Sequence, residues 1–105
     1  MTKEFWIGDV LSGKYDDAEV ELCGWVHRTR GSKKIRFVVL RDSTGTLQCV
    51  IKRDTVGEEC FESLSNALIE SSVRVKGTVK NTDREHGHEL VIETGTVIGH
   101  VNPEN

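Results

Sequence analysis

The spacing of apolar and polar residues changes along the chain and predicts five strands and one helix. From residue 19 the residues alternate, with Val20 and Leu22 on one side and Glu19 and Glu21 on the other. This alternation is typical of a half-buried strand, expected over residues 19–30. Gly24 lies inside it, and a glycine there indicates a bulge or a sharp bend. Further strands are expected at residues 34–41, 46–52, 71–80 and 89–98.

A helix is expected between the third and fourth strands. Thr55-Val56-Gly57-Glu58 matches the capping-box pattern of a helix start. Phe61, Leu64 and Leu68 follow at helical spacing and form one apolar stripe. The pattern predicts one helix of about three turns.

The two ends of the chain are expected to lie outside this unit. Residues 1–18 are expected to form an N-terminal extension that packs on the body of the domain, with Trp6, Ile7, Val10 and Leu11 in a short helical turn. Residues 101–105 contain the only proline of the chain and are interpreted as the start of a linker. Residues 19–100 are then the main domain.

The order strand-strand-strand-helix-strand-strand predicts the fold class. It is the order of the five-stranded Greek-key barrel called the OB-fold, an all-β fold with one helix between the third and fourth strands. Such barrels bind oligonucleotides and oligosaccharides on the face around the second and third strands. Those two strands are expected to form a hairpin closed by Asp42-Ser43-Thr44-Gly45.

That hairpin carries an aromatic residue, an amide and nearby cations. Phe37 lies on its first strand and Gln48 on its second, and five of the nine residues from Arg28 to Arg36 are cationic. Together they suit a surface that stacks on unpaired bases and contacts their edges. Alternatively, Phe37 is a core residue, Gln48 an ordinary exposed amide and the basic run a solvated hairpin.

Composition excludes several classes of protein. A chain of 105 residues with 36% hydrophobic and 30% charged residues is expected to form one ordered domain. Its net charge of −3 does not argue against nucleic-acid binding, because binding depends on the local electrostatic potential. No apolar run is long enough to span a membrane and no signal peptide is evident, so a cytoplasmic location is expected. Cys23, Cys49 and Cys60 lie far apart, and His86-Gly87-His88 has no third ligand nearby, so no metal site is expected. No catalytic constellation and no phosphate-binding loop is present.

Two stretches of the chain resemble a known family. Gly24-Trp25-Val26-His27-Arg28-Thr29-Arg30 and the run from Phe37 through Leu40-Arg41-Asp42 and Gly45 to Gln48 are similar to the N-terminal anticodon-binding domain of class IIb aminoacyl-tRNA synthetases. These are the aspartyl, asparaginyl and lysyl enzymes. Glu70-Ser71-Ser72-Val73 and Gly87-His88-Glu89-Leu90 look most like the asparaginyl enzyme. The likeness covers about residues 20–98.

The resemblance implies roles for individual residues. Phe37 matches the aromatic residue that stacks on the central anticodon base, a uridine, and Gln48 matches the glutamine that hydrogen-bonds this base. Arg30 matches an arginine near the same base, and Glu89 matches a glutamate of the anticodon surface. From the residues themselves, contacts with the phosphate backbone are expected from Arg28, Lys33, Lys34 and Arg36.

The resemblance also implies a larger context. Members of this family carry an aminoacylating domain that uses ATP and Mg²⁺ and is commonly dimeric. This chain alone is not expected to aminoacylate, to need a cofactor or to dimerise. The expected partner is the anticodon loop of a tRNA, with tRNA-Asn favoured over tRNA-Asp. Two other interpretations fit the residues: a general single-strand-binding OB protein, and a protein-interaction module whose basic hairpin binds an acidic partner.

Overall fold

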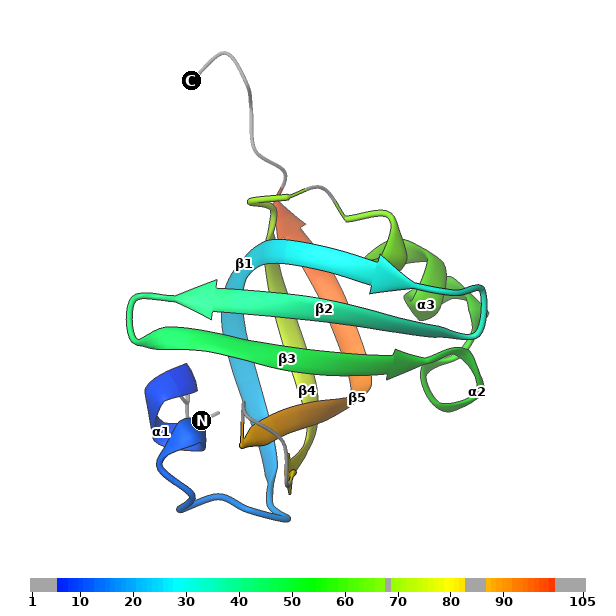
Figure 1. The fold of residues 1–105 in the computed structure, drawn as a ribbon. Coiled ribbons are helices and arrows are strands. Elements are labelled where there is room, and N and C mark those ends of the chain that lie inside the picture. Colours follow the sequence, from blue (N-terminus) through cyan, green and yellow to red (C-terminus); the bar gives the residue numbers. More distant parts are fainter. Residues whose placement is uncertain (1–5, 68, 83–86, 100–105) are drawn as a thin grey trace.

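A closed five-stranded barrel forms the body of the molecule in the computed structural model, which describes residues 6–67, 69–82 and 87–99 (Figure 1). Neighbouring strands follow the order β1-β2-β3-β5-β4, so the OB-fold prediction is confirmed. The elements are α1 (Ile7–Leu11), β1 (Glu19–Gly31), β2 (Ile35–Asp42), β3 (Gly45–Lys52), α2 (Arg53–Val56), α3 (Glu58–Ser65), β4 (Ser72–Asn81) and β5 (His88–Gly99).

The barrel closes because β1 pairs with two strands. Its first half pairs with β4 and its second half with β2, and Trp25 has a partner on both sides, Arg41 and Ser72. A bulge or a sharp bend was expected at Gly24. The bulge lies at His27 instead, because the register between β1 and β2 shifts between Val26 and Arg28, whereas β1 passes from β4 to β2 directly after Gly24. Gly24 serves another purpose: a Cβ there would lie 2.9 Å from the carbonyl oxygen of Arg41. The absent side chain allows the two backbones to approach closely.

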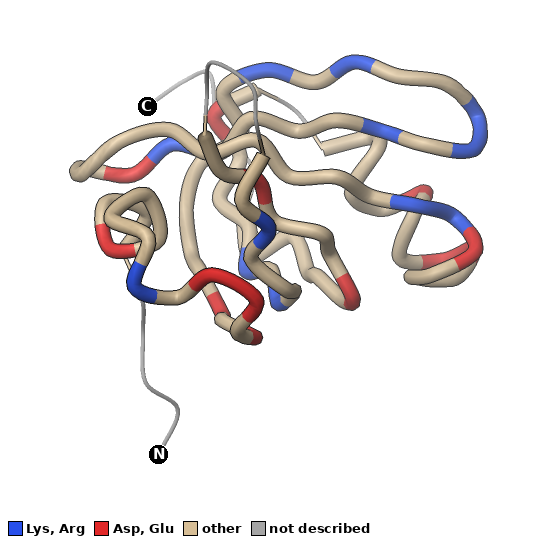
Figure 2. The backbone as a smooth tube through the Cα atoms, turned by 60° about the horizontal axis from the view of Figure 1, so that its bottom comes forward, with Lys and Arg blue, Asp and Glu red and all other residues tan. Residues whose placement is uncertain are grey.

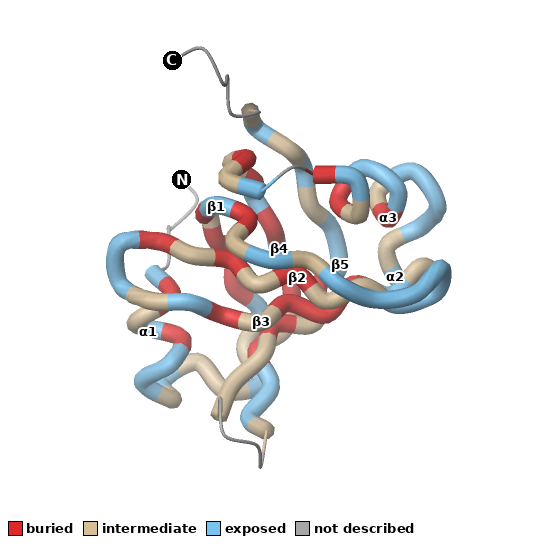
Figure 3. The backbone as a smooth tube through the Cα atoms, turned by 45° about the horizontal axis from the view of Figure 1, so that its top comes forward, coloured by how far each residue is buried: buried red, intermediate tan, exposed pale blue. Residues whose placement is uncertain are grey.

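Inward-facing residues of all five strands form one core. The predicted alternation is confirmed on β4, where Val73, Val75 and Val79 are buried and Arg74 and Lys76 are exposed. On Figure 3 the buried segments run through the middle of the strands, whereas the connection between β1 and β2 is exposed. The buried aliphatic side chains come from every strand: Val20, Leu22, Val26, Val38, Leu40, Leu47, Ile51, Val73, Val75, Val79, Leu90 and Ile92.

The helical connection differs from the prediction. Two short helices, α2 and α3, replace the single helix, and the break lies at Gly57, which has φ of 89°. The predicted capping box is absent, because Thr55 already lies inside α2 and the N-cap of α3 is Gly57, without a side-chain hydrogen bond. Phe61 and Leu64 are buried as expected, whereas Leu68 lies outside the described residues.

The short N-terminal helix α1 packs against the barrel. Ile7 and Val10 are fully buried in the common core, which confirms a helical turn here, but Trp6 and Leu11 are exposed. The carboxylate of Asp42 connects α1 to the hairpin: its Oδ2 accepts a hydrogen bond from the Ile7 N–H at 2.8 Å, and its Oδ1 accepts one from the Thr44 N–H at 2.7 Å. The tail at residues 101–105 lies outside the described residues. None of the described helices is long and apolar enough to cross a membrane.

Candidate nucleic-acid interface

The outer face of the β2–β3 hairpin carries the predicted aromatic residue and amide together. Phe37 lies opposite Val50, and Val39 lies opposite Gln48, so all four side chains share one face. On the other side of β2, Arg30 is the partner of Phe37 and Arg28 is the partner of Val39. Cross-strand neighbours on one face are close enough for their side chains to interact.

A depression of about 400 Å³ lies at this face. Phe37 is half-buried and does not belong to the core cluster, so its ring is available at the surface. Gln48 contributes to the same depression from β3. The lining residues are His27, Arg28, Thr29, Arg30, Phe37, Val39, Thr46 and Gln48. A concave site with an aromatic ring, an amide and two arginines can accept an unpaired base.

A cation covers one part of the Phe37 ring. The guanidinium carbon of Arg30 lies 5.0 Å from the ring centroid, which is within the range of a cation–π contact. A guanidinium plane also stacks on bases. Arg30 and Phe37 therefore offer two stacking surfaces in one place.

Glu89 approaches the amide from the neighbouring strand. β3 and β5 are parallel, and Gln48 and Glu89 are partners in their register. The Nε2 of Gln48 donates a hydrogen bond to the Oε2 of Glu89 at 3.4 Å. Both side chains are half-buried. The structure thus brings together Arg30, Phe37, Gln48 and Glu89, the four residues expected at the anticodon surface.

The basic residues predicted to contact phosphates separate into two groups. Arg28, Lys33 and Lys34 are exposed, and Figure 2 shows Lys and Arg positions gathered along β1, β2 and their connection. Arg36 has the opposite orientation, because its strand parity is that of the inward residue Val38. Its guanidinium donates to the Oγ1 of Thr29 at 2.8 Å and to the Gly31 carbonyl at 3.3 Å. Arg36 therefore supports the loop and lies apart from the Phe37 depression.

Arg53 fixes the basic loop to the helices. Its Nε donates to the Lys33 carbonyl at 2.7 Å, and its backbone N–H donates to the Lys34 carbonyl at 2.9 Å. The guanidinium also pairs with Glu58 and Glu62 and lies 4.3 Å from the centroid of the Phe61 ring. The hydrogen bond with Glu58 raises the pKa of Arg53, so this tether stays charged.

Sequence reasoning missed four residues of the depression: His27, Thr29, Val39 and Thr46. Val39 and Thr46 follow from the parity of Phe37 and Gln48, which the sequence gives once the face is known. His27 could not be placed by parity, because it lies at the bulge where the β1 alternation slips by one residue.

The polar residues outside the hairpin form no metal site in the part of the chain that the structure describes. His88 lies with its Nε2 2.9 Å from the Oδ1 of Asp16, and its predicted companion His86 lies outside the described residues. The three cysteines are free thiols. Cys49 is buried, and this burial strongly raises the pKa of its thiol, which therefore stays protonated.

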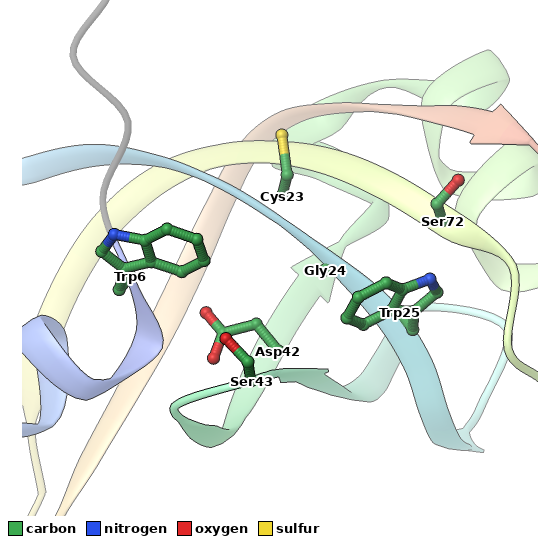
Figure 4. A pocket seen from close by; sticks show the side chains of 7 residues that line it. All are labelled: Trp6, Cys23, Gly24, Trp25, Asp42, Ser43 and Ser72. Carbon is green, nitrogen blue, oxygen red and sulfur yellow. The ribbon is translucent and has the colours of Figure 1, made fainter.

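A second depression, of about 320 Å³, lies between the middle of β1 and the turn that joins β2 to β3. Trp6 and Trp25 are 52% and 45% exposed, and their indole rings enter it from opposite sides (Figure 4). Cys23, Gly24, Asp42, Ser43 and Ser72 complete the lining.

Comparison with known proteins identifies the class to which this barrel and its outer face belong. Residues 20–98 match the tRNA anticodon family of OB-fold nucleic acid binding domains, and the chain belongs to this family. Within the family, its relatives include asparagine–tRNA ligases and aspartate–tRNA(Asp/Asn) ligases, and the matched segment lies in the anticodon-binding domain.

Two relatives and one solved structure illustrate this similarity. The chain is 36% identical to an asparagine–tRNA ligase of Thermoplasma acidophilum over 84% of this chain and 21% of the relative. It is 39% identical to an aspartate–tRNA(Asp/Asn) ligase of Methanopyrus kandleri over 88% of this chain and 21% of the relative. The asparaginyl-tRNA synthetase of Pyrococcus horikoshii, solved with asparaginyl-adenylate, has a TM-score of 0.87 and 37% identity, covering all of this chain and 25% of that one.

The chain therefore spans about a fifth of the length of these relatives. Four OBody structures bound to hen egg-white lysozyme also align, with TM-scores of 0.75 to 0.81 at 16 to 17% identity. Identity at that level shows the shared fold alone.

Proposed function

We propose that this domain recognises the anticodon loop of tRNA-Asn and reads its central uridine with Phe37 and Gln48. The observation that carries the proposal is that Phe37 and Gln48 line the same depression, together with Arg28 and Arg30. The ring stacks on the base, the amide hydrogen-bonds its edge, and the cations hold the backbone. Arg28, Lys33 and Lys34 supply the sequence-independent part of the affinity.

The closest alternative is recognition of tRNA-Asp, or of both tRNAs. The relative from Methanopyrus kandleri is named for both aspartate and asparagine tRNAs, and it is as similar to this chain as the asparaginyl relatives are. Both anticodons share the central uridine and differ at the third base. Phe37 and Gln48 thus serve either specificity, and residues around them decide between the two.

In a longer protein of the relatives' length, this domain would supply tRNA recognition to an ATP- and Mg²⁺-dependent asparagine–tRNA ligase, which we expect to be a homodimer. The residues described here bind and orient RNA. The domain itself needs no cofactor for this binding, and we expect it to bind RNA as a monomer.

Titration of short fluorescent anticodon stem-loops tests the proposal. A GUU loop is compared with a loop whose central uridine is replaced by adenosine, at low and at physiological salt. We expect a preference for GUU that persists at the higher salt. Phe37→Ala should weaken the binding of GUU about tenfold or more, because stacking on an aromatic ring contributes about 1–3 kcal/mol per base, and a base that is no longer held at Gln48 should lose the preference. Gln48→Ala should lose the preference as well.

Two lysine-to-alanine variants, which remove the same charge, separate phosphate contacts from base recognition. Lys33→Ala should weaken both loops equally and reduce the salt dependence, since phosphate contacts carry no sequence information. Lys76→Ala removes the same charge from β4 at a position away from Glu89, where Lys76 pairs with Glu19, and should leave binding unchanged. Equal affinity of the wild-type domain for both loops, falling together with salt, would favour a general single-strand binder instead.

A further inference from the structure

The hydrogen bond between Gln48 and Glu89 limits the orientation of the Gln48 amide. An ionised carboxylate accepts hydrogen bonds and donates none. The group that Gln48 turns toward Glu89 must therefore be its NH₂, as the contact from Nε2 to Oε2 at 3.4 Å shows. The register enforces this arrangement, because Gln48 and Glu89 are direct partners on parallel strands.

The fixed amide presents a defined pattern to a base in the depression. With Nε2 held at Glu89, the carbonyl Oε1 and the second N–H of the NH₂ group remain for a ligand. A carbonyl acceptor next to an N–H donor is complementary to uracil, whose N3–H donates and whose O4 accepts. Cytosine carries the reverse pattern, an acceptor at N3 and a donor at its 4-amino group, and requires the amide to be flipped.

A flipped amide would place Oε1 against the Glu89 carboxylate. Two acceptors would then face each other in a half-buried site, which removes the hydrogen bond between Gln48 and Glu89 and adds electrostatic repulsion. We infer that Glu89 is a positioning residue that locks the Gln48 amide in the orientation that reads uracil and rejects cytosine. This inference rests on the proposed function, since it assumes that the central base lies at Phe37 and Gln48.

The test compares the affinities for GUU and GCU stem-loops in variants of two glutamates on the same strand. Glu89→Gln replaces the carboxylate with an amide that can both donate and accept, so either orientation of Gln48 becomes acceptable. We expect the wild-type domain to prefer GUU about tenfold, as one mispaired hydrogen-bonding group predicts. In Glu89→Gln the preference should fall to about twofold, mainly through tighter binding of GCU.

Glu93→Gln is the matched control. Glu93 is an exposed residue of β5 that accepts a hydrogen bond from Thr78. Its replacement removes the same charge from the same strand at a position away from Gln48, and the wild-type ratio of the affinities for GUU and GCU should be retained. Glu89→Ala is a second variant, in which the Gln48 amide no longer has a carboxylate to donate to. Thermal unfolding of all variants checks that the barrel is intact.

The outcomes separate the two proposals. A wild-type preference for GUU that persists in Glu89→Gln and Glu89→Ala would overturn the positioning role and leave the proposed function standing. A wild-type domain without any preference would overturn both. An RNA-free measurement adds an independent check: the side-chain amide protons of Gln48 should lose their hydrogen-bonded NMR shift in Glu89→Ala and keep it in Glu93→Gln, and an identical shift in the two variants would contradict the inference.

Discussion

The guanidinium of Arg30 lies over the ring of Phe37 on the neighbouring strand, 5.0 Å from its centroid. The two residues are also register partners, so the contact follows from the pairing of β1 with β2. It exists only because the bulge at His27 shifts the register by one residue before Arg28. Without the bulge, Arg28 and Arg30 would point to the opposite face of the strand.

Replacing Arg30 with lysine should separate the contribution of its positive charge to RNA binding from that of its flat guanidinium. Lys keeps the positive charge but lacks the flat guanidinium that stacks on the ring and on a base. Because a cation–π contact at an exposed site contributes about 0.5–1 kcal/mol, we expect about threefold weaker binding of the anticodon stem-loop. The salt dependence should stay unchanged, and a change in its slope would mean that Arg30 acts through a phosphate. Fluorescence titration at several salt concentrations measures both quantities.

Replacing Asp42 with alanine should destabilise the domain. Asp42 is 8% exposed, and its carboxylate accepts hydrogen bonds from the backbone of Ile7, Thr44 and Gly45. Their loss leaves buried donors unpaired and detaches α1 from the hairpin, so the free energy of unfolding should fall by about 3 kcal/mol. Urea denaturation measures this change. The neighbouring exposed Ser43 is the control, and Ser43→Ala should stay within about 0.5 kcal/mol of the wild type.

Replacing Gly57 with alanine should destabilise the domain through backbone strain alone. Gly57 has φ of 89° and ψ of 163°, and a Cβ there would meet no atom within 4 Å. Because this region is nearly restricted to glycine, we expect a loss of about 2 kcal/mol in the free energy of unfolding. Glu59→Ala, at an exposed position of α3, is the control. An unchanged stability would contradict the backbone strain assigned to this position.

The pH dependence of stability should include a contribution from Glu19 and Lys76. The hydrogen bond with Lys76 lowers the pKa of Glu19 from its usual 4.5, and the same bond raises the pKa of Lys76 from its usual 10.5. The contribution from Glu19 is therefore present above pH 4.5 and is lost as the pH falls through the lowered pKa. The contribution from Lys76 is present below pH 10.5 and is lost as the pH rises through the raised pKa.

A comparison with Glu19→Gln tests this dependence. The variant should have a flatter stability curve below pH 4.5, measured by urea denaturation at a series of pH values. The ion pair lies at the surface, so the difference at neutral pH should be small. Identical acid profiles of the two proteins would contradict the assignment.

The strands and most of the site could be predicted because each depends on local pattern. Alternation placed Val73, Val75 and Val79 inward, and it turned Gln48 outward. Parity left the side of Phe37 open, because both faces of its strand are apolar, and the pairing of β2 with β3 places it on the face of Gln48. The break at Gly57 and the bulge at His27 were missed, because both depend on how the chain packs against distant strands. Arg36 was placed with the exposed cations, since a basic residue at an inward strand position is not expected before its hydrogen bonds to Thr29 and Gly31 are known.

The Arg53 tether has a thermodynamic consequence for RNA binding. Because Arg53 holds the carbonyls of Lys33 and Lys34 in place, the basic loop is ordered before any ligand arrives. A preorganised loop loses little conformational entropy on binding, and more of the interaction energy is retained as affinity. Glu58 and Glu62 neutralise the guanidinium of Arg53, so Arg53 itself does not attract phosphate. The loop can thus be rigid in shape while its exposed lysines stay free to follow the backbone of different RNA loops.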